Sequence, residues 1–188
     1  MDYEKLRKII HLFGFIALVY YLIPVPDIQR DIMALVVVLI VLIFEFLRIV
    51  FDFNIPLFRN YEKDSLSGFG WCAIGLILSF ILFPKWVNIP VVVAWAWIDP
   101  FIGYYRKKRW GIPAALLLYT TIFYLFAYLM IEHVSAAFFI MGPLVAIVGV
   151  WSEMLGKKEE FRWLNDDLTM VLFPAAAYFV LAYLAGIL

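Results

Sequence analysis

The sequence predicts an all-α integral membrane protein, a bundle of about seven transmembrane helices that forms one domain over residues 1–188. Hydrophobic residues make up 66% of the chain and the mean hydropathy is +0.95, whereas soluble domains are close to half apolar. Several apolar runs approach the ~20 residues that a helix needs to cross a bilayer. The runs are continuous rather than alternating, and a small open sheet cannot cross lipid, so strands are not expected.

We expect the seven spans at 8–23, 32–51, 66–83, 86–103, 112–131, 134–153 and 168–187. The first follows the basic start of "RKIIHLFG", and the second begins after "PVPDIQRD". The others are separated by "DFNIPLFRNYEKD", "PKW", "YYRKKRWG", "IEH" and "EMLGKKEEFRWLNDD". The first span lacks a small-residue cleavage site, so we do not expect it to be a cleaved signal. The chain has a single cysteine, Cys72, which excludes an internal disulfide. For the same reason we do not expect a metal cluster held by cysteines.

Basic residues are distributed very unequally between the two sides of the membrane in this arrangement. Two of the fifteen lie on the far side, Arg30 and Lys85. The other thirteen lie on the side of the N-terminus: Lys5, Arg7, Lys8, Arg48, Arg59, Lys63, Arg106, Lys107, Lys108, Arg109, Lys157, Lys158 and Arg162. Because cytoplasmic loops carry the excess of lysine and arginine, we expect a cytoplasmic N-terminus and a C-terminus outside.

Twelve of the fifteen acidic residues fall on the same side, which the positive-inside rule does not require. Glu45, Asp99 and Glu153 are the notable ones, because each lies within or at the end of an apolar span. Ionisable groups at such depth are costly, and they usually pair or face a polar cavity. The sequence therefore predicts a polar site in the cytoplasmic half and a scaffold in the outer half.

The stretch "RKIIHLFG" places Arg7, His11 and Gly14 on one helix face. Arg7 and Lys8 could bind phosphate or anchor the helix at the membrane edge. His11 lies one turn deeper, where a packed structural histidine and a functional one are both open interpretations.

In "FEFLRIVFDFN", Glu45, Arg48 and Asp52 share a helix face. One interpretation is an internal ion pair that lets Glu45 sit in the membrane. The other is that the pair orients a loop or a phosphate-binding arginine.

The stretch "AWIDPFIGYYRKKRWG" places Asp99 directly before Pro100. A residue before proline is biased away from the α region, and proline suits the first turn of a helix. We therefore expect the span to break at Asp99 and restart, with Asp99 capping a short helix and Gly103 allowing a close approach. The basic residues that follow could anchor the span or neutralise a nucleotide triphosphate: Arg106, Lys107, Lys108 and Arg109.

Glu153 is embedded at the end of the sixth span, in "GVWSEMLG". Asn165, Asp166 and Asp167 open the seventh span, and any one of them could cap it. A cap needs only one of the three. Magnesium prefers hard oxygen ligands, often one or two carboxylates together with phosphate oxygens. Asp99, Asp166 and Asp167 would supply these ligands if their helices converge.

Taken in order, these motifs resemble the dolichol kinase / phytol kinase family of CTP-dependent membrane lipid-alcohol kinases, which includes diacylglycerol kinases and is distantly similar to phosphatidate cytidylyltransferases. The similar stretches are "RKIIHLFG", "FEFLRI", "EKDSLSGFGWCAIG", "AWIDPFIGYYRKKRWG", "WSEMLG" and "DDLTMVL". The chain departs from the family pattern at Ile98, where the family tends to have glycine, and at Asp167 and Val171, where it tends to have asparagine and proline. The lysine-serine motif that the family has after the fourth span is not recognisable in "IPAALLLYTTIF".

The resemblance implies transfer of the γ-phosphoryl group of CTP, or another nucleotide, to a polyprenol, dolichol, phytol or geranylgeraniol dissolved in the bilayer. No nucleic-acid partner is expected. We expect Mg²⁺ on Asp99, Asp166 and Asp167, with Asp99, His11 and Glu153 in catalysis. The expected nucleotide-binding residues are all basic: Arg7, Lys8, Arg48, Arg106, Lys107, Lys108 and Arg109. Because the family has asparagine at position 167, this interpretation expects Asp166→Asn to be damaging and Asp167→Asn to be tolerated.

Three other functions remain open from the sequence. A cytidylyltransferase acting on a lipid phosphate would also use metal and CTP, but it would release pyrophosphate. A transporter is disfavoured by the one-sided polar residues and by the lack of a visible internal repeat. In a non-catalytic scaffold, the carboxylates would serve only as caps and ion pairs.

Overall fold

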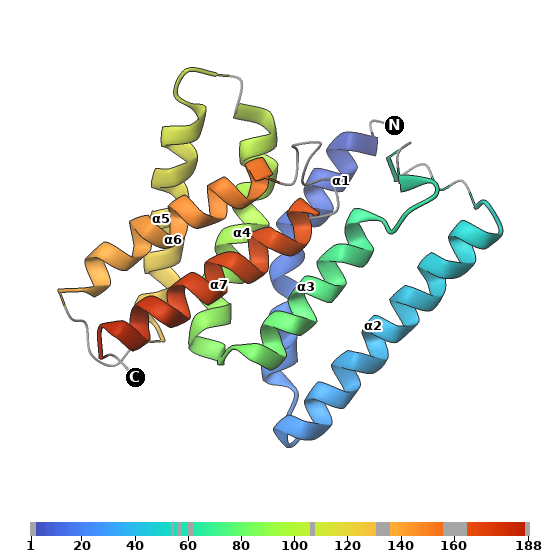
Figure 1. The fold of residues 1–188 in the computed structure, drawn as a ribbon, viewed down its shortest axis with the longest axis horizontal. Coiled ribbons are helices and arrows are strands. Elements are labelled where there is room, and N and C mark those ends of the chain that lie inside the picture. Colours follow the sequence, from blue (N-terminus) through green and yellow to red (C-terminus); the bar gives the residue numbers. More distant parts are fainter. Residues whose placement is uncertain are drawn as a thin grey trace.

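The computed structural model describes residues 3–53, 55, 58–59, 62–105, 108–130, 136–155 and 165–186. All regular structure in these residues is helical, which confirms the predicted all-α class. The elements are α1 (Tyr3–Leu12), η1 (Gly14–Leu22), α2 (Asp27–Val50), α3 (Gly68–Leu82), α4 (Lys85–Tyr105), α5 (Gly111–Tyr128), α6 (Phe138–Leu155) and α7 (Asp166–Leu184) (Figure 1). Helices α2, α4, α5, α6 and α7 are long and apolar enough to cross a membrane. The chain is therefore a multi-pass integral membrane protein.

The first expected span, 8–23, is not one continuous α-helix. Helix α1 ends at Leu12, and η1 continues as nine residues of 3-10 helix. Gly14 stands at the change of helix type, and a Cβ there would lie 3.0 Å from the Trp95 ring. The absence of a side chain at Gly14 therefore lets η1 lie directly against α4.

The third expected span, 66–83, is also shorter than a typical transmembrane helix. Helix α3 has 15 residues, which at 1.5 Å per residue gives a length of about 22 Å. The hydrocarbon core of a bilayer is about 30 Å thick. Helix α3 begins at Gly68 and, as described below, its first turn lies beside the candidate site.

Helix α4 forms the centre of the bundle and packs against α1, η1, α3, α5 and α7. In its most apolar 18-residue stretch 61% of the residues are buried, against 22% for α2. Helix α2 lies at the edge of the bundle beside α3 (Figure 1). The interior of α4 is almost fully buried, for example at Val91, Ala94 and Ile98. The central helix therefore provides a fixed support for the side chains near its C-terminal end.

A buried polar cluster joins three elements at the end of α3 where the chain turns into α4. The Asn88 side-chain amide donates to the Tyr21 hydroxyl at 2.7 Å and to the Ser79 carbonyl at 2.9 Å. The Ser79 hydroxyl donates to the Asn88 side-chain carbonyl. Ser79 and Asn88 are both fully buried. These hydrogen bonds satisfy polar groups in an apolar interior and fix η1 against the α3–α4 turn.

Candidate functional site

Three side chains from three helices converge near the ends of α1, α4 and α7. His11 Nδ1 lies 3.2 Å from Asp99 Oδ2, and His11 Nε2 lies 3.9 Å from Asp167 Oδ1. One potential ligand atom from each residue can be chosen so that all three lie within 4.8 Å of one another. This His11–Asp99–Asp167 cluster is half-buried to buried, with side-chain exposures of 10%, 22% and 9%. Its members were all candidates from the sequence.

The cap of α7 explains why Asp167 is available to the cluster. Asn165 is the N-cap residue, and its side-chain oxygen accepts a hydrogen bond from the Asp167 backbone N–H at 2.8 Å. Because Asn165 caps the helix, the Asp166 and Asp167 carboxylates are not needed for capping. Both carboxylates are nonetheless buried, with 8% and 6% of each residue exposed. The interpretation of these two aspartates as simple caps is therefore not supported.

The expected helix break at Asp99 is wrong. Helix α4 runs from Lys85 to Tyr105 with Pro90 and Pro100 inside it. A proline in a helix removes one backbone hydrogen bond, and here the loss is offset by dense packing around the most buried helix of the bundle. Asp99 therefore projects from a continuous helix and does not cap a short one.

The expected close approach at Gly103 is wrong as well. Among the residues that the structure describes, a Cβ at this position would have no heavy atom within 4 Å. Gly103 is exposed, and it can serve as a control position for substitutions near the site.

The first turn of α3 forms one side of the site through a contact that the sequence did not indicate. A Cβ at Gly68 would lie 2.6 Å from Asp167 Oδ2, which is closer than real side-chain contacts allow. Ser67 caps α3 by accepting from the Gly70 backbone N–H at 3.2 Å. The Gly68 N–H donates to Glu62 Oε1 at 3.2 Å. The serine before an apolar run is a recognisable cap signal, but the contact between Gly68 and Asp167 depends on tertiary packing.

Glu45 and Arg48 form a buried ion pair that holds the loop before α3. Arg48 Nη2 donates to Glu45 Oε2 at 2.9 Å, and each residue is only 2% exposed. Arg48 also donates to the backbone carbonyls of Lys63 and Ser65, at 3.3 Å and 2.6 Å. Glu45 accepts from the Ser67 N–H at 3.0 Å and from its hydroxyl at 2.6 Å. Of the two interpretations of this motif, these contacts favour the pair that orients a loop.

Cationic side chains lie at the same end of the bundle as the cluster. The charge of Arg7 acts on His11, and the charge of Arg59 acts on Asp167. Lys8 and Lys108 both approach the ring of Tyr104, at 6.0 Å and 5.3 Å from its centroid. The start of α1 and the loop after α4 thus bring positive charge to the same end of the bundle, and Arg59 is a member of this set that sequence reasoning did not select.

The remaining predicted site residues lie outside the cluster or outside the described part of the chain. Glu153 is fully buried in α6, which packs on α7. Asp166 is not among the three clustered residues. The guanidinium carbon of Arg109 lies 5.7 Å from the centroid of the Trp110 ring. Arg106 and Lys107 fall in a segment that the structure does not describe. The catalytic role of Glu153 and the metal role of Asp166 therefore stay predictions.

Comparison with known proteins adds no relative. No protein-family profile, curated protein or solved structure matches this chain.

The close approach of Gly68 to Asp167 leads to a prediction. Gly68→Ala would place a methyl group 2.6 Å from Asp167 Oδ2, so the carboxylate must shift from its position in the cluster. Misplacement of a reacting group by about 1 Å can reduce a rate by about a hundredfold, so we expect a fall in activity of at least about tenfold. The melting temperature in detergent should change little, because alanine is a good helix former. The measurement is the initial rate of the phosphoryl transfer that the sequence resemblance implies, together with thermal unfolding.

The control for this prediction is Gly103→Ala, which introduces the same methyl group at a position where no described residue lies within 4 Å of it. It should keep wild-type activity. Equal activities of the two variants would show that the position of Asp167 does not matter for the reaction.

Proposed function

We propose that this protein is a membrane lipid-alcohol kinase that transfers the γ-phosphoryl group of CTP, or another nucleotide, to a long-chain prenol at the cytoplasmic face. The observation that carries the proposal is the His11–Asp99–Asp167 cluster at one end of a membrane helix bundle. Basic side chains lie at the same end. Phosphoryl transfer depends mainly on positioning, divalent metal and cations rather than on covalent catalysis. The resemblance of the ordered motifs to the dolichol kinase / phytol kinase family supports this reaction type.

The donor set of the cluster fits a hard divalent cation. Mg²⁺ is usually held by one or two carboxylates together with substrate phosphates, and Mn²⁺ accepts the same oxygen ligands. Asp99 and Asp167 would hold the ion. When bound, such an ion neutralises charge on the phosphate oxygens. The competing explanation of the cluster is a protonated His11 that lies between the two carboxylates, and this arrangement requires no metal.

The cluster also contains a group that can take a proton. In the proposed reaction the lipid oxygen forms a bond to the γ-phosphorus, the bond from that phosphorus to the bridging oxygen breaks, and the nucleoside diphosphate leaves. The hydroxyl proton goes to Nε2 of His11. Asp99 Oδ2 lies 3.2 Å from Nδ1, close enough for its charge to stabilise the protonated ring. Arg7 and Arg59 supply positive charge on the nucleotide side.

The test uses the purified full chain in phosphatidylcholine nanodiscs with Mg²⁺ and a panel of prenols, lipid phosphates and diacylglycerol. Label from the γ-position of CTP or ATP should appear in a prenol product. Label from the α-position in the lipid, with release of pyrophosphate, would show a cytidylyltransferase. Absence of both labels with every substrate would overturn the proposal and favour a scaffold or a transporter.

Metal binding is measured separately, by titration of Mn²⁺ against the purified protein. The proposal expects binding that Asp99→Asn weakens and that Mg²⁺ displaces. Absence of binding at millimolar Mn²⁺, with nucleotide present, would support the ion-pair explanation of the cluster.

A further inference from the structure

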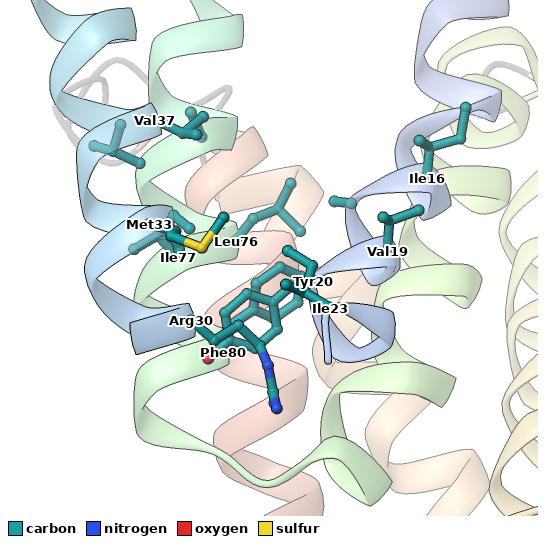
Figure 2. A pocket seen from close by; sticks show the side chains of 14 residues that line it. Ile16, Val19, Tyr20, Ile23, Arg30, Met33, Val37, Leu76, Ile77 and Phe80 are labelled. Carbon is teal, nitrogen blue, oxygen red and sulfur yellow. The ribbon is translucent and has the colours of Figure 1, made fainter. Parts of the chain in front are cut away.

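An apolar groove lies on the membrane-facing side of the molecule between η1 and α2, with α3 as its floor (Figure 2). Ile16 and Val19 form one wall, Met33 and Val37 form the other, and Leu76 and Ile77 lie between them. Its volume is about 330 Å³. Among the described residues that line the groove, Arg30 is the charged one, and it stands at the end where η1 finishes and α2 begins.

The groove exists because the two elements that form its walls pack against different helices. Helix α2 packs against α3, whereas η1 packs against α4 and α1. The two elements are joined near the turn between them, where the Tyr20 hydroxyl donates to Asp31. Between that turn and the opposite end of α2, α3 forms the floor of the groove, where Ala73 and Ile77 are half-buried and Leu76 and Phe80 are buried.

The same elements connect the groove to the candidate site. His11 is in the last turn of α1, five residues before Ile16, which lines the groove on η1. On the floor, Gly68 lies against Asp167, and the groove-lining residues of α3 run from Ala73 to Phe80. At 1.5 Å per residue, the groove begins about 8 Å from Gly68 and ends about 18 Å from it. One leaflet of the hydrocarbon core, half of about 30 Å, is similar in depth to the distance of about 18 Å at which the groove ends.

We propose that this groove binds the hydrocarbon chain of the lipid whose hydroxyl is presented to His11, Asp99 and Asp167. The proposal rests on the proposed function for the identity of the headgroup chemistry. The groove is continuous with the surface of α2 that faces the bilayer, where Val36, Ile40 and Ile43 are about half exposed. Its lining carries no charge over the stretch that a chain would follow from the site, which matches an uncharged hydrocarbon. Because the groove is open on its lipid side, longer chains emerge into the bilayer instead of being rejected.

This arrangement predicts a chain-length profile. The apparent affinity for primary alcohols should rise with chain length while each added group is buried in the groove, and it should level off once the groove is filled. A profile without this plateau, rising steadily with membrane partitioning, would contradict a bounded groove.

The decisive experiment compares two tryptophan substitutions on adjacent residues of α3. Ile77 lines the groove, whereas Leu78 is 40% exposed and does not line it. The probe is a long-chain primary alcohol with a diazirine in the middle of its chain, in phosphatidylcholine vesicles that contain the full protein. In the wild type, photolabelling should concentrate on η1 and on the groove-facing residues of α2 and α3, and geranylgeraniol should compete with it. Ile77→Trp should reduce this labelling by about tenfold, because overpacking of a filled apolar site has a cost of this order. Leu78→Trp should leave it unchanged.

The readouts separate this inference from the proposed function. Labelling does not require turnover, so groove labelling that Ile77→Trp removes supports the lipid site even if no phosphoryl transfer is found. Uniform labelling of the membrane-facing surface, or equal labelling in both variants, overturns the groove even if the protein is a kinase. Cross-links between two copies of the chain through η1 and α2 would overturn it as well, because a second copy would then occupy the groove.

Discussion

Replacing Asp167 by asparagine is expected to reduce the proposed phosphoryl transfer by at least about a hundredfold, because even the loss of a side chain that hydrogen-bonds to a metal ligand costs about 10- to 100-fold. Asp167 contributes the carboxylate that lies 3.9 Å from His11 and belongs to the candidate ligand set. Asparagine has the same shape but lacks the charge that a divalent cation requires. The α7 cap should persist, because it uses the Asp167 backbone N–H and the Asn165 side chain. The measurement is the initial rate over a Mg²⁺ titration, with thermal unfolding in detergent as the check on folding.

The matched control is Asp166→Asn. Asp166 is adjacent and similarly buried, but it is not among the clustered residues. Its substitution should leave the Mg²⁺ dependence close to that of the wild type. The reverse result, with Asp166→Asn inactive and Asp167→Asn active, would restore the expectation drawn from the family resemblance and would exclude the cluster as the metal site.

Arg48→Met is expected to destabilise the protein by about 3–5 kcal/mol, because removing one partner of a buried ion pair leaves the other charge uncompensated. In the part of the chain that the structure describes, the substitution would leave buried Glu45 with its hydrogen bonds from Ser67. It would also release the carbonyls of Lys63 and Ser65. The loop before α3 should then loosen, which would be seen as a lower melting temperature in detergent and as faster proteolysis between α2 and α3.

Two variants sharpen this result. Lys63→Ala removes an exposed ion pair to Asp52, whose N–O distance is 3.1 Å and whose side chains are 58% and 65% exposed. A pair of this kind is worth about 0–1 kcal/mol, so the melting temperature should hardly change. The double variant Glu45→Met/Arg48→Met removes both charges and should recover part of the lost stability. A melting temperature of Arg48→Met equal to that of the wild type would exclude the structural role of the pair.

The fold could be predicted from the sequence where length and hydropathy decide it. Helices α2, α4, α5, α6 and α7 match expected spans because a long apolar run has few alternatives in a membrane. The 3-10 conformation of η1 could not be predicted, since its composition is equally suited to an α-helix. At Asp99 and Pro100 a local rule predicted a break, but the packing of α4 outweighed the loss of one hydrogen bond.

The sequence predicted which residues belong to the site better than it predicted how they are arranged. His11 and Asp99 stood out because ionisable residues are costly in apolar segments. The choice between Asp166 and Asp167 depends on the rotation of α7 about its axis, and successive helical residues differ by about 100°. The sequence left that rotation open because any of Asn165, Asp166 and Asp167 could serve as the cap. The contact of Gly68 with Asp167 joins segments far apart in the chain, and no local pattern reveals it.

The helix type of η1 determines how far side chains at the two ends of the first span are rotated relative to each other about the helix axis. A 3-10 helix has 3.0 residues per turn, so it turns about 120° per residue where an α-helix turns about 100°. From Gly14 to Tyr20 the difference accumulates to roughly 120°, a third of a turn. An α-helical version that kept His11 beside Asp99 would therefore point Tyr20 away from Asp31, with which its hydroxyl is hydrogen-bonded. The 3-10 segment thus acts as a rotational spacer, which allows one short stretch of chain to place a histidine correctly at one end and a tyrosine correctly at the other.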